Sequence, residues 1–317
     1  MEQCIINSKY KITGKLGSGK FGNIYKATNI KTNMPVAIKM EDVSATIQLL
    51  RHETTILNYL YNEGTRNIPA VFWYGVYGEN LCTAMTLFDH SLLDYMKAPM
   101  IAETIYSVIG QCVLTLESIH KNFVIHRDIK PENIMVKDGR ARIIDFGLSM
   151  FYVNEKREHL VNEPRTELTG TPKWASVFLH QGNSVSRRDD LVSLAYVFLF
   201  LLNKGSLAWN NVSIDEVPPA DQNVFINNSS KKYVYKNGKK YEVPERTETC
   251  GASPHGEIAI AHPKNIVRRL HKENLDSNQS IRDPILKKFI SHCYGLSYNE
   301  EPDYDLLIDI LKNNIKK

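Results

Sequence analysis

The stretch of residues 126–147 restricts the fold of this chain more than any other part of the sequence. It contains His-Arg-Asp-Ile-Lys-Pro-Glu-Asn and, after a short gap, Asp-Phe-Gly. In the first motif, Asp128 is followed by Lys130 and Asn133, and the second motif opens on Asp145. Transfer of a phosphoryl group needs one carboxylate that orients a hydroxyl, together with an amide and a second carboxylate that hold Mg²⁺ against the phosphates. The two motifs therefore predict a site for phosphoryl transfer.

These motifs resemble the catalytic and metal-binding loops of eukaryotic-type protein kinases, which implies ATP and Mg²⁺ as cofactors. Asp128 would accept the proton of the substrate hydroxyl, and Lys130 would neutralise charge on the γ-phosphate. Asn133 and Asp145 would ligate Mg²⁺ as hard oxygen donors. Taken singly, a surface aspartate, a surface lysine and a capping asparagine are the commoner interpretations, but their joint order and spacing favour catalysis. A lysine at position 130 is typical of serine/threonine kinases.

Upstream, residues 10–41 alternate apolar and polar side chains around a glycine-rich turn, which predicts strands joined by tight turns. The turn reads Gly-Ser-Gly-Lys-Phe-Gly over residues 17–22. Glycines allow close approach of the backbone to phosphates, although this motif alone is weak evidence and an ordinary turn is the alternative. Val-Ala-Ile-Lys follows at residues 36–39 and favours a nucleotide site. Lys39 would reach the α- and β-phosphates, and Ala37 would pack on the adenine.

Residues 44–61 carry a helical pattern of apolar side chains, and Glu53 is the only carboxylate in the middle of that helix. We expect Glu53 to pair with Lys39 and to fix its position, because Glu41 and Asp42 are too close to Lys39 in the sequence. The alternative interpretation of Glu53 is a solvated helix carboxylate.

The kinase resemblance also implies which residues contact the nucleotide. Residues 86–89 would form a hinge between a strand-rich and a helical lobe, and its backbone would bond to the adenine edge. Met85 would control access behind the adenine, although by pattern alone it is simply a core methionine. The full set of implied nucleotide contacts is Leu16, Gly17, Ser18, Gly19, Gly22, Ile24, Ala37, Lys39, Met85, Thr86, Leu87 and Met135.

Three motifs after Asp-Phe-Gly narrow the resemblance. They are Leu-Thr-Gly-Thr-Pro-Lys-Trp-Ala-Ser from residue 168, Ser-Arg-Arg-Asp-Asp-Leu from residue 186 and Gly-Ser-Leu-Ala-Trp from residue 205. They are similar to signatures of the casein kinase I family. The chain resembles this family over about residues 10–210 and again over about residues 283–312. The vaccinia-related kinases are neighbours, but they usually carry glycine where this chain has Asp189.

This resemblance implies an α+β, bilobal protein kinase fold, with an antiparallel-sheet N-lobe over residues 1–87 and a helical C-lobe over residues 88–317. Thr171 would lie beside the catalytic pair and help to shape the phospho-acceptor site. Asp190 would be a buried carboxylate that braces the catalytic loop. The implied enzyme is a serine/threonine kinase that needs no activation-loop phosphorylation and prefers acidic or already phosphorylated substrates.

Two departures from the family concern substrate choice. Lys173 stands where the family usually has an arginine for its anion pocket, and lysine supplies charge without a bidentate fork. Residues 210–281 appear as an insertion, in which residues 232–243 alternate around Asn-Gly and predict a β-hairpin. The lysines of this hairpin would form a basic strand edge. That edge is either a solvated one, protected by its charges against pairing with other strands, or a docking surface for an acidic partner.

The composition limits the remaining function classes. A net charge of +4 does not mark a nucleic-acid binder, and five scattered cysteines without CxxC spacing indicate reduced thiols in an intracellular protein, cytoplasmic or nuclear. The longest apolar run, residues 191–202, is shorter than the roughly 20 residues that a membrane span needs and predicts a buried core helix. We therefore expect a monomer with protein substrates and no membrane anchor.

Two other functions are consistent with parts of this pattern. A pseudokinase would act as a binding or regulatory module, but the chain has every reacting residue named above. A small-molecule kinase with similar lobes is disfavoured by the peptide-site signature around Thr171 and by the arginine pair at 187–188. The sequence therefore favours an active protein kinase.

Overall fold

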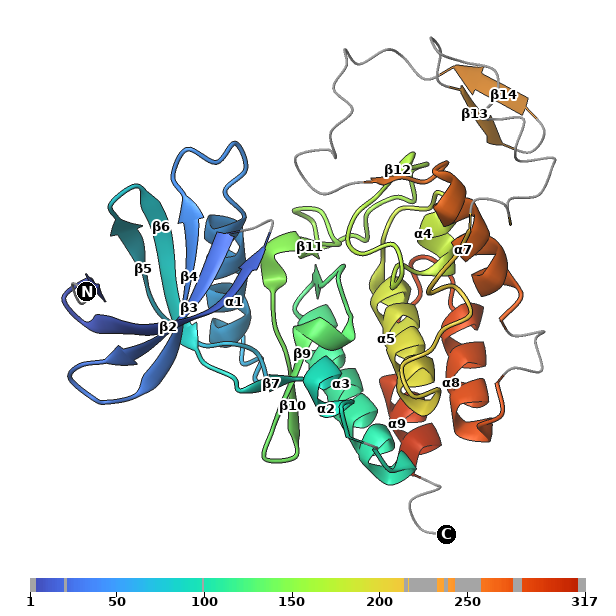
Figure 1. The fold of residues 1–317 in the computed structure, drawn as a ribbon. Coiled ribbons are helices and arrows are strands. Elements are labelled where there is room, and N and C mark those ends of the chain that lie inside the picture. Colours follow the sequence, from blue (N-terminus) through green and yellow to red (C-terminus); the bar gives the residue numbers. More distant parts are fainter. Residues whose placement is uncertain are drawn as a thin grey trace.

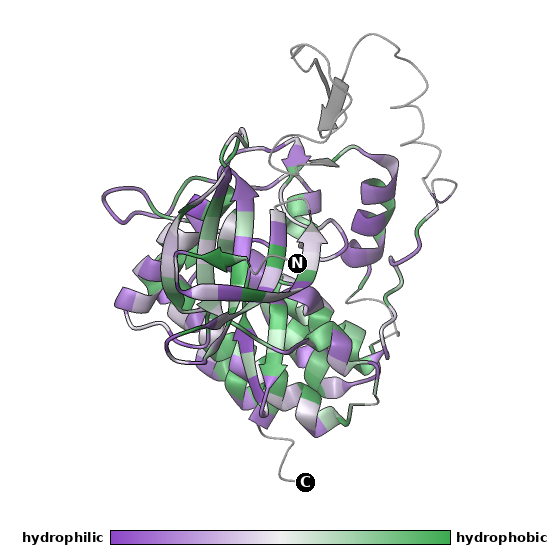
Figure 2. Cartoon of the chain, turned by 60° about the vertical axis from the view of Figure 1, so that its left-hand side comes forward, coloured by the Kyte–Doolittle hydropathy of each residue, from purple (hydrophilic) through white to green (hydrophobic). Residues whose placement is uncertain are grey.

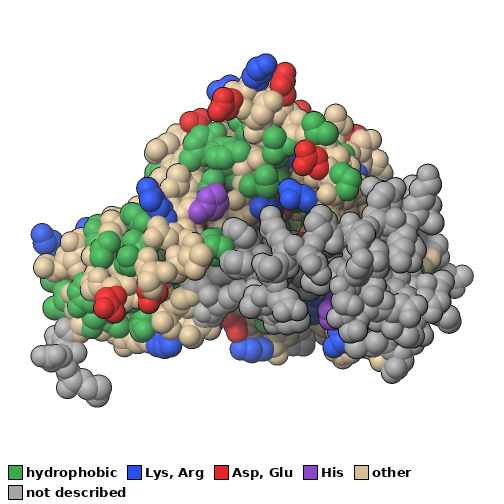
Figure 3. Space-filling model, turned by 90° about the horizontal axis from the view of Figure 1, so that it is seen from above, with side chains coloured by type: hydrophobic (Ala, Val, Ile, Leu, Met, Phe, Trp, Pro, Cys, Tyr) green, Lys and Arg blue, Asp and Glu red, His purple; other side chains and the backbone are tan. Residues whose placement is uncertain are grey.

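The computed structural model describes residues 4–19, 22–98, 100–213, 216, 233–236, 239–242, 258–275 and 281–312. The chain folds into a sheet-rich N-lobe and a larger helical C-lobe, which lie side by side in Figure 1. This arrangement confirms the predicted α+β, bilobal fold class. On the face seen in Figure 3, acidic and basic side chains are interspersed among the described residues.

The N-lobe is built on one antiparallel sheet in the strand order β1-β2-β3-β4-β6-β5. Its strands are β1 (Ile5–Ile6), β2 (Tyr10–Gly19), β3 (Gly22–Asn29), β4 (Pro35–Asp42), β5 (Val71–Tyr77) and β6 (Asn80–Thr86). Gly22, which opens β3, has φ +110°, and a Cβ at this position would lie 2.0 Å from the carbonyl oxygen of Met40. Only glycine therefore fits where the glycine-rich turn enters β3.

The helix α1 (Leu49–Asn62) packs in the N-lobe and begins five residues later than the sequence pattern predicted. The carboxylate of Glu41 accepts hydrogen bonds from the backbone N–H of Leu49 at 3.2 Å and of Leu50 at 3.0 Å. A carboxylate that satisfies the first free N–H groups stabilises a helix start, so the contact with β4 decides where α1 begins. The apolar face of the helix is buried as the pattern predicted.

Four helices form the core of the C-lobe: α3 (Ala102–Lys121), α5 (Arg187–Leu202), α8 (Pro284–Gly295) and α9 (Tyr304–Lys312). Figure 2 shows hydrophobic residues concentrated where these helices pack together. The apolar run 191–202 lies in α5 and is buried along almost its whole length, which confirms the predicted core helix. Within the described residues, no helix has the length and apolar character to cross a membrane.

Short elements flank the two loops that contain the His-Arg-Asp and Asp-Phe-Gly motifs, or follow these loops in the chain. They are β7 (His90–Ser91), α2 (Leu92–Tyr95), β8 (Val124–Ile125), η1 (Pro131–Asn133), β9 (Ile134–Lys137), β10 (Arg140–Ile143), η2 (Phe146–Leu148), β11 (Met150–Phe151), β12 (Glu167–Leu168) and α4 (Val177–His180). The loop of the first motif runs from β8 to β9, and Asp145 follows β10. Because β9 and β10 pair with each other, both loops emerge at the same end of that hairpin.

Part of the range 210–281 is described. The predicted hairpin is confirmed, since β13 (Tyr233–Lys236) pairs with β14 (Lys239–Glu242) in antiparallel register. Its Asn-Gly turn, and most of residues 214–257, lie outside the described residues. Further along, β15 (Ile258–Ala259) pairs with β12, and α7 (Pro263–Glu273) packs against α4. The end of the range is thus built onto the segment that follows Asp-Phe-Gly.

Candidate active site

Lys39 on β4 lies between two carboxylates that come from different parts of the chain. Its Nζ is 2.7 Å from Oε2 of Glu53 on α1 and 2.9 Å from Oδ1 of Asp145. The other oxygen of Glu53 accepts the backbone N–H of Phe146 at 3.2 Å. The side chain of Glu53 is 2% exposed, so it is not the solvated carboxylate of the alternative interpretation. The ion pair expected from the sequence is therefore present.

The charges in this cluster stabilise one another. Burial alone would lower the pKa of Lys39, but Glu53 and Asp145 outweigh burial and raise it above its ordinary value. Burial alone would raise the pKa of Asp145, but the ammonium of Lys39 holds it below the ordinary value. Both groups are therefore charged at neutral pH. Of the two carboxylates, Asp145 is the more exposed, at 29% of its side chain.

Asp128 is held by donors on both of its carboxylate oxygens. Lys130 Nζ lies 2.5 Å from Oδ2, and the hydroxyl of Thr171 donates to Oδ1 at 2.8 Å. The amide of Asn133 donates to Oδ2 at 3.1 Å and to the backbone oxygen of Asp128 at 2.9 Å. These contacts fix the orientation of a nearly buried carboxylate. The structure thus brings Asp128, Lys130, Asn133 and Thr171 into one cluster.

The carboxylate of Asp190 on α5 fixes the backbone of the catalytic loop through hydrogen bonds. Its carboxylate accepts the N–H of His126 at 2.7 Å and the N–H of Arg127 at 2.9 Å. Burial alone would raise the pKa of Asp190, but its bonds to His120 and to the loop hold it below the ordinary value. Arg127 and Asp145 both adopt positive φ, at 72° and 67°. Such backbone conformations are costly for residues other than glycine and persist only where the surroundings enforce them.

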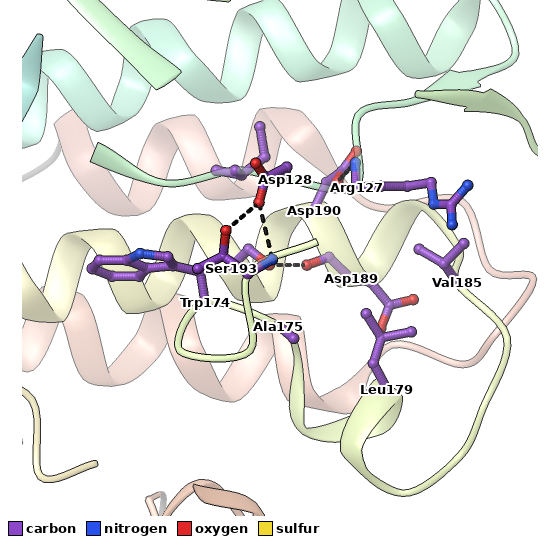
Figure 4. Close-up of a pocket in the computed structure, with 11 residues that line it drawn as sticks. Arg127, Asp128, Trp174, Ala175, Leu179, Val185, Asp189, Asp190 and Ser193 are labelled. Atoms are coloured by element: carbon purple, nitrogen blue, oxygen red, sulfur yellow. Dashed lines mark hydrogen bonds between the residues drawn. The ribbon is translucent and has the colours of Figure 1, made fainter. Parts of the chain in front are cut away.

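The segment around Thr171 closes over this loop. Figure 4 shows Asp128, Asp189 and Asp190 around a cavity of about 10 Å³, with Trp174 and Ala175 beside it. Lys173 does not extend into solvent: its Nζ lies 4.6 Å from the ring centroid of Trp174 and 4.5 Å from that of Phe200. Burial lowers the pKa of Lys173 below the ordinary value. This lysine is half-buried over two aromatic rings.

The expected nucleotide contacts lie on five strands. Leu16, Gly17, Ser18 and Gly19 are on β2, Gly22 and Ile24 on β3, Ala37 and Lys39 on β4, Met85 and Thr86 on β6 with Leu87 directly after it, and Met135 on β9. Ala37 is the register partner of Met85, and Ile24 is the partner of Lys39. Leu16 and Ile24 are exposed, whereas Met85 is buried. The strand pairing therefore places the residues of β3, β4 and β6 on one continuous stretch of sheet.

The residues present fit Mg²⁺ as part of a metal–nucleotide complex. Asn133 uses its amide NH₂ to bond to Asp128, so its Oδ1 remains the group that can ligate a cation. The backbone N–H of Ile144 donates to the carbonyl of Asn133 at 2.9 Å, which places Asp145 beside it. Within the described residues, no cluster of three or more metal-binding side chains exists. One amide and one carboxylate suit Mg²⁺, which commonly completes its coordination with phosphates and water.

Sequence reasoning missed two parts of this site. His120 on α3 lies 3.0 Å from Asp190 through Nε2 and 2.7 Å from the hydroxyl of Tyr304 through Nδ1, so α9 reaches the catalytic loop through two side chains. Asp189 also forms part of the support: it accepts the N–H of Ser186 and the hydroxyl of Ser176, and burial raises its pKa to about 6. No periodic pattern marks the contacts of His120, because its partners lie 70 and 184 positions away in the chain. The Asp189 contact with Ser186 is local: the two residues are three positions apart and form a capping box at the start of α5, a signal that the sequence does carry.

In a comparison with known protein families, the chain matches the family described as the protein kinase domain. The family model matches residues 10–300, which include most of both lobes and every residue of the site described above except Tyr304.

Proposed function

The chain belongs to the protein kinase family, and from that premise we propose that it is a serine/threonine protein kinase that transfers the γ-phosphate of ATP to protein hydroxyl groups. The observation that carries the proposal is the Asp128 carboxylate, which is oriented by Lys130 on one oxygen and by Thr171 on the other. A base held in one orientation and a cation beside it are what attack by a hydroxyl on a phosphate requires.

In this mechanism each residue has one task. Asp128 receives the proton of the substrate hydroxyl as its oxygen attacks, and Lys130, which already contacts that carboxylate, neutralises charge that develops on the transferred group. Lys39, fixed by Glu53, holds the α- and β-phosphates. Asn133 and Asp145 would hold a Mg²⁺ ion that arrives with ATP, and this ion would supply positive charge to the phosphates. The strands that carry Leu16, Ile24, Ala37, Met85 and Met135 would enclose the adenine.

The alternative is a pseudokinase that binds partners without transferring phosphate. The contacts of Lys39, Glu53, Asp128, Asn133 and Asp145 favour catalysis, because each residue is in a position from which it can act. A small-molecule kinase is disfavoured by the arrangement of Thr171, which joins the catalytic loop to the segment that a peptide would meet.

The test is transfer of labelled phosphate from Mg-ATP to casein and to serine, threonine and tyrosine peptides. Lys39→Met is expected to lower kcat/KM by about 10²-fold or more, because it removes a charged group fixed against the phosphates. Lys31→Met, which replaces an exposed lysine in the turn between β3 and β4, should retain full activity. Wild-type protein that transfers no more phosphate than Lys39→Met would support the pseudokinase instead.

We also propose that the enzyme prefers acidic or already phosphorylated substrates, as its resemblance to the casein kinase I family implies. Lys173 is the tentative anion-binding residue, and it would have to leave its place over Trp174 and Phe200 to reach a phosphate. Lys173→Ala is expected to lower the ratio of kcat/KM for a primed peptide over its unprimed match by about three- to tenfold, a loss typical of one exposed ionic contact. An unchanged ratio would exclude Lys173 from substrate recognition.

The remaining proposals concern the setting of the enzyme. The described cysteines Cys4, Cys82, Cys112 and Cys293 are free thiols, which is consistent with action inside the cell, in the cytoplasm or nucleus. The mild net charge supports protein rather than nucleic-acid partners. Action as a monomer stays a prediction, which light scattering of the purified protein would check.

A further inference from the structure

Lys272 on α7 is a fully buried lysine that lies outside the catalytic cluster. Its exposed fraction is 0%, and within the described residues it takes part in no ion pair with a carboxylate. Burial and the nearby Arg268 lower its pKa well below the ordinary value of lysine. A buried amine without a carboxylate is costly unless its donors are satisfied in another way.

The donors of Lys272 are satisfied by the segment that follows Thr171. Its Nζ donates to the carbonyl oxygen of Pro172 at 3.1 Å and to that of Ala175 at 2.6 Å. A third contact, at 3.0 Å, is with Nε2 of the buried His180 on α4, a ring nitrogen that also lies 3.0 Å from the carbonyl oxygen of Pro172. The two carbonyl oxygens thus accept hydrogen bonds from two N–H donors of Lys272. The rings of Tyr196 and Trp209, whose centroids lie 4.9 Å and 5.4 Å from Nζ, add favourable contacts for a cation.

These contacts bracket the residue proposed to meet the substrate. The two carbonyls bound by Lys272 lie on either side of Lys173 and Trp174, and the intervening carbonyl of Lys173 accepts a bond from the indole N–H of Trp209 at 2.9 Å. The backbone of residues 172–175 is therefore fixed from its buried side. Pro172 and Lys173 are partly exposed, and this partly exposed part of the segment is left for the peptide.

The same segment is connected to the base. Thr171 directly precedes Pro172 and donates both its backbone N–H and its hydroxyl to Asp128. A second tie lies upstream, where β15 pairs with β12 and the N–H of Ile260 donates to the carbonyl of Thr166 at 2.9 Å. Residues 258–275 thus contact the segment after Asp-Phe-Gly at two places: β15 binds residues 166–168, and Lys272 binds residues 172–175. Of these two contacts, that of Lys272 lies next to Thr171.

We propose that Lys272 is a positioning residue for the protein substrate: it fixes residues 172–175 in the conformation that accepts a peptide beside Asp128. The proposal rests on the proposed kinase function. It predicts that loss of Lys272 weakens the use of peptide substrate far more than the use of ATP, because the nucleotide residues lie on other elements.

The decisive variant is Lys272→Met, which keeps the length of the side chain and removes its donors. We expect KM for the peptide to rise about tenfold, the effect of losing roughly one charge-assisted hydrogen bond, while KM for ATP stays within about twofold of wild type. Amide hydrogen exchange of residues 171–175 should become faster. Lys264→Met is the matched control, because Lys264 lies on the same helix but is exposed.

Lys272→Gln, which retains two N–H donors, should give values between those of wild type and Lys272→Met. Unchanged peptide KM and unchanged exchange in folded Lys272→Met would overturn the proposal. Failure of both variants to fold, with Lys264→Met folded, would also overturn it, because Lys272 would then serve the stability of the whole lobe. If wild-type protein transfers no phosphate, the proposed function fails, and hydrogen exchange still decides whether Lys272 orders the segment.

Discussion

Replacement of Asp128 by asparagine is expected to lower kcat by about 10²- to 10⁴-fold, the usual contribution of a general base. The physical reason is local. Asparagine can still accept the bonds of Thr171, but its NH₂ would face the donors of Lys130 and Asn133, which now meet a carboxylate oxygen. The variant thus loses the proton acceptor and places a donor against two donors.

Steady-state phosphorylation of casein and measurement of Mg-ATP affinity by calorimetry check this prediction. ATP affinity should change little, because the expected nucleotide contacts lie on the strands and on Lys39. Asp309→Asn, which changes an exposed carboxylate on α9, is the matched control. Retention of more than about a tenth of the wild-type kcat would exclude Asp128 as the base.

Asp190→Ala is expected to have the largest effect on stability. It removes the common acceptor of the N–H groups of His126 and Arg127 and of the His120 ring, and it leaves three buried donors unpaired. At about 1–3 kcal/mol for each unsatisfied buried group, with partial relaxation, we expect a loss of about 3–5 kcal/mol in the free energy of unfolding. Catalysis should fall as well, because the loop that carries Asp128 loses its support.

The pH dependence gives a second signature of Asp190. Its folded-state pKa is below the ordinary value of aspartate, so the stabilisation is present above that value and is lost as the pH falls through the folded-state pKa. The difference in unfolding free energy between wild type and Asp190→Ala should therefore be constant from neutral pH down to about pH 5 and shrink in more acidic solution. Denaturant titrations at several pH values measure it. A difference below about 1 kcal/mol at neutral pH, equal to that of Asp309→Ala, would show that the loop does not depend on Asp190.

Local sequence patterns were sufficient for much of the fold. Alternation around Asn-Gly predicted the pairing of β13 with β14, and the apolar run predicted α5 as a core helix. The start of α1 could not be predicted in this way, because the carboxylate that stabilises it belongs to Glu41 on a neighbouring strand. Periodicity in the sequence predicts which face of a helix or strand is buried. It does not predict which side chain of another element will form hydrogen bonds with the end of a helix.

The same distinction applies to the candidate site. Asp128, Lys130 and Asn133 are close in sequence, so spacing alone indicated that they act together, and the ion pair of Lys39 with Glu53 followed from a single available carboxylate. The links from Tyr304 through His120 to Asp190 span as many as 184 positions and carry no pattern. Lys272 lies among other basic residues of α7, and lysine is seldom buried, yet its side chain is fully buried.

The sequence by itself determined the reaction class that we propose. The groups that would act on the phosphate lie in a few short motifs, and the order and spacing of these motifs can be read directly from the chain. Only the tertiary structure decided what holds those groups still. Buried donors and acceptors find partners wherever packing brings them within about 3 Å. The support of the catalytic loop by Asp190, and of the peptide segment by Lys272, therefore depends on how α5 and α7 pack rather than on any neighbour in the sequence.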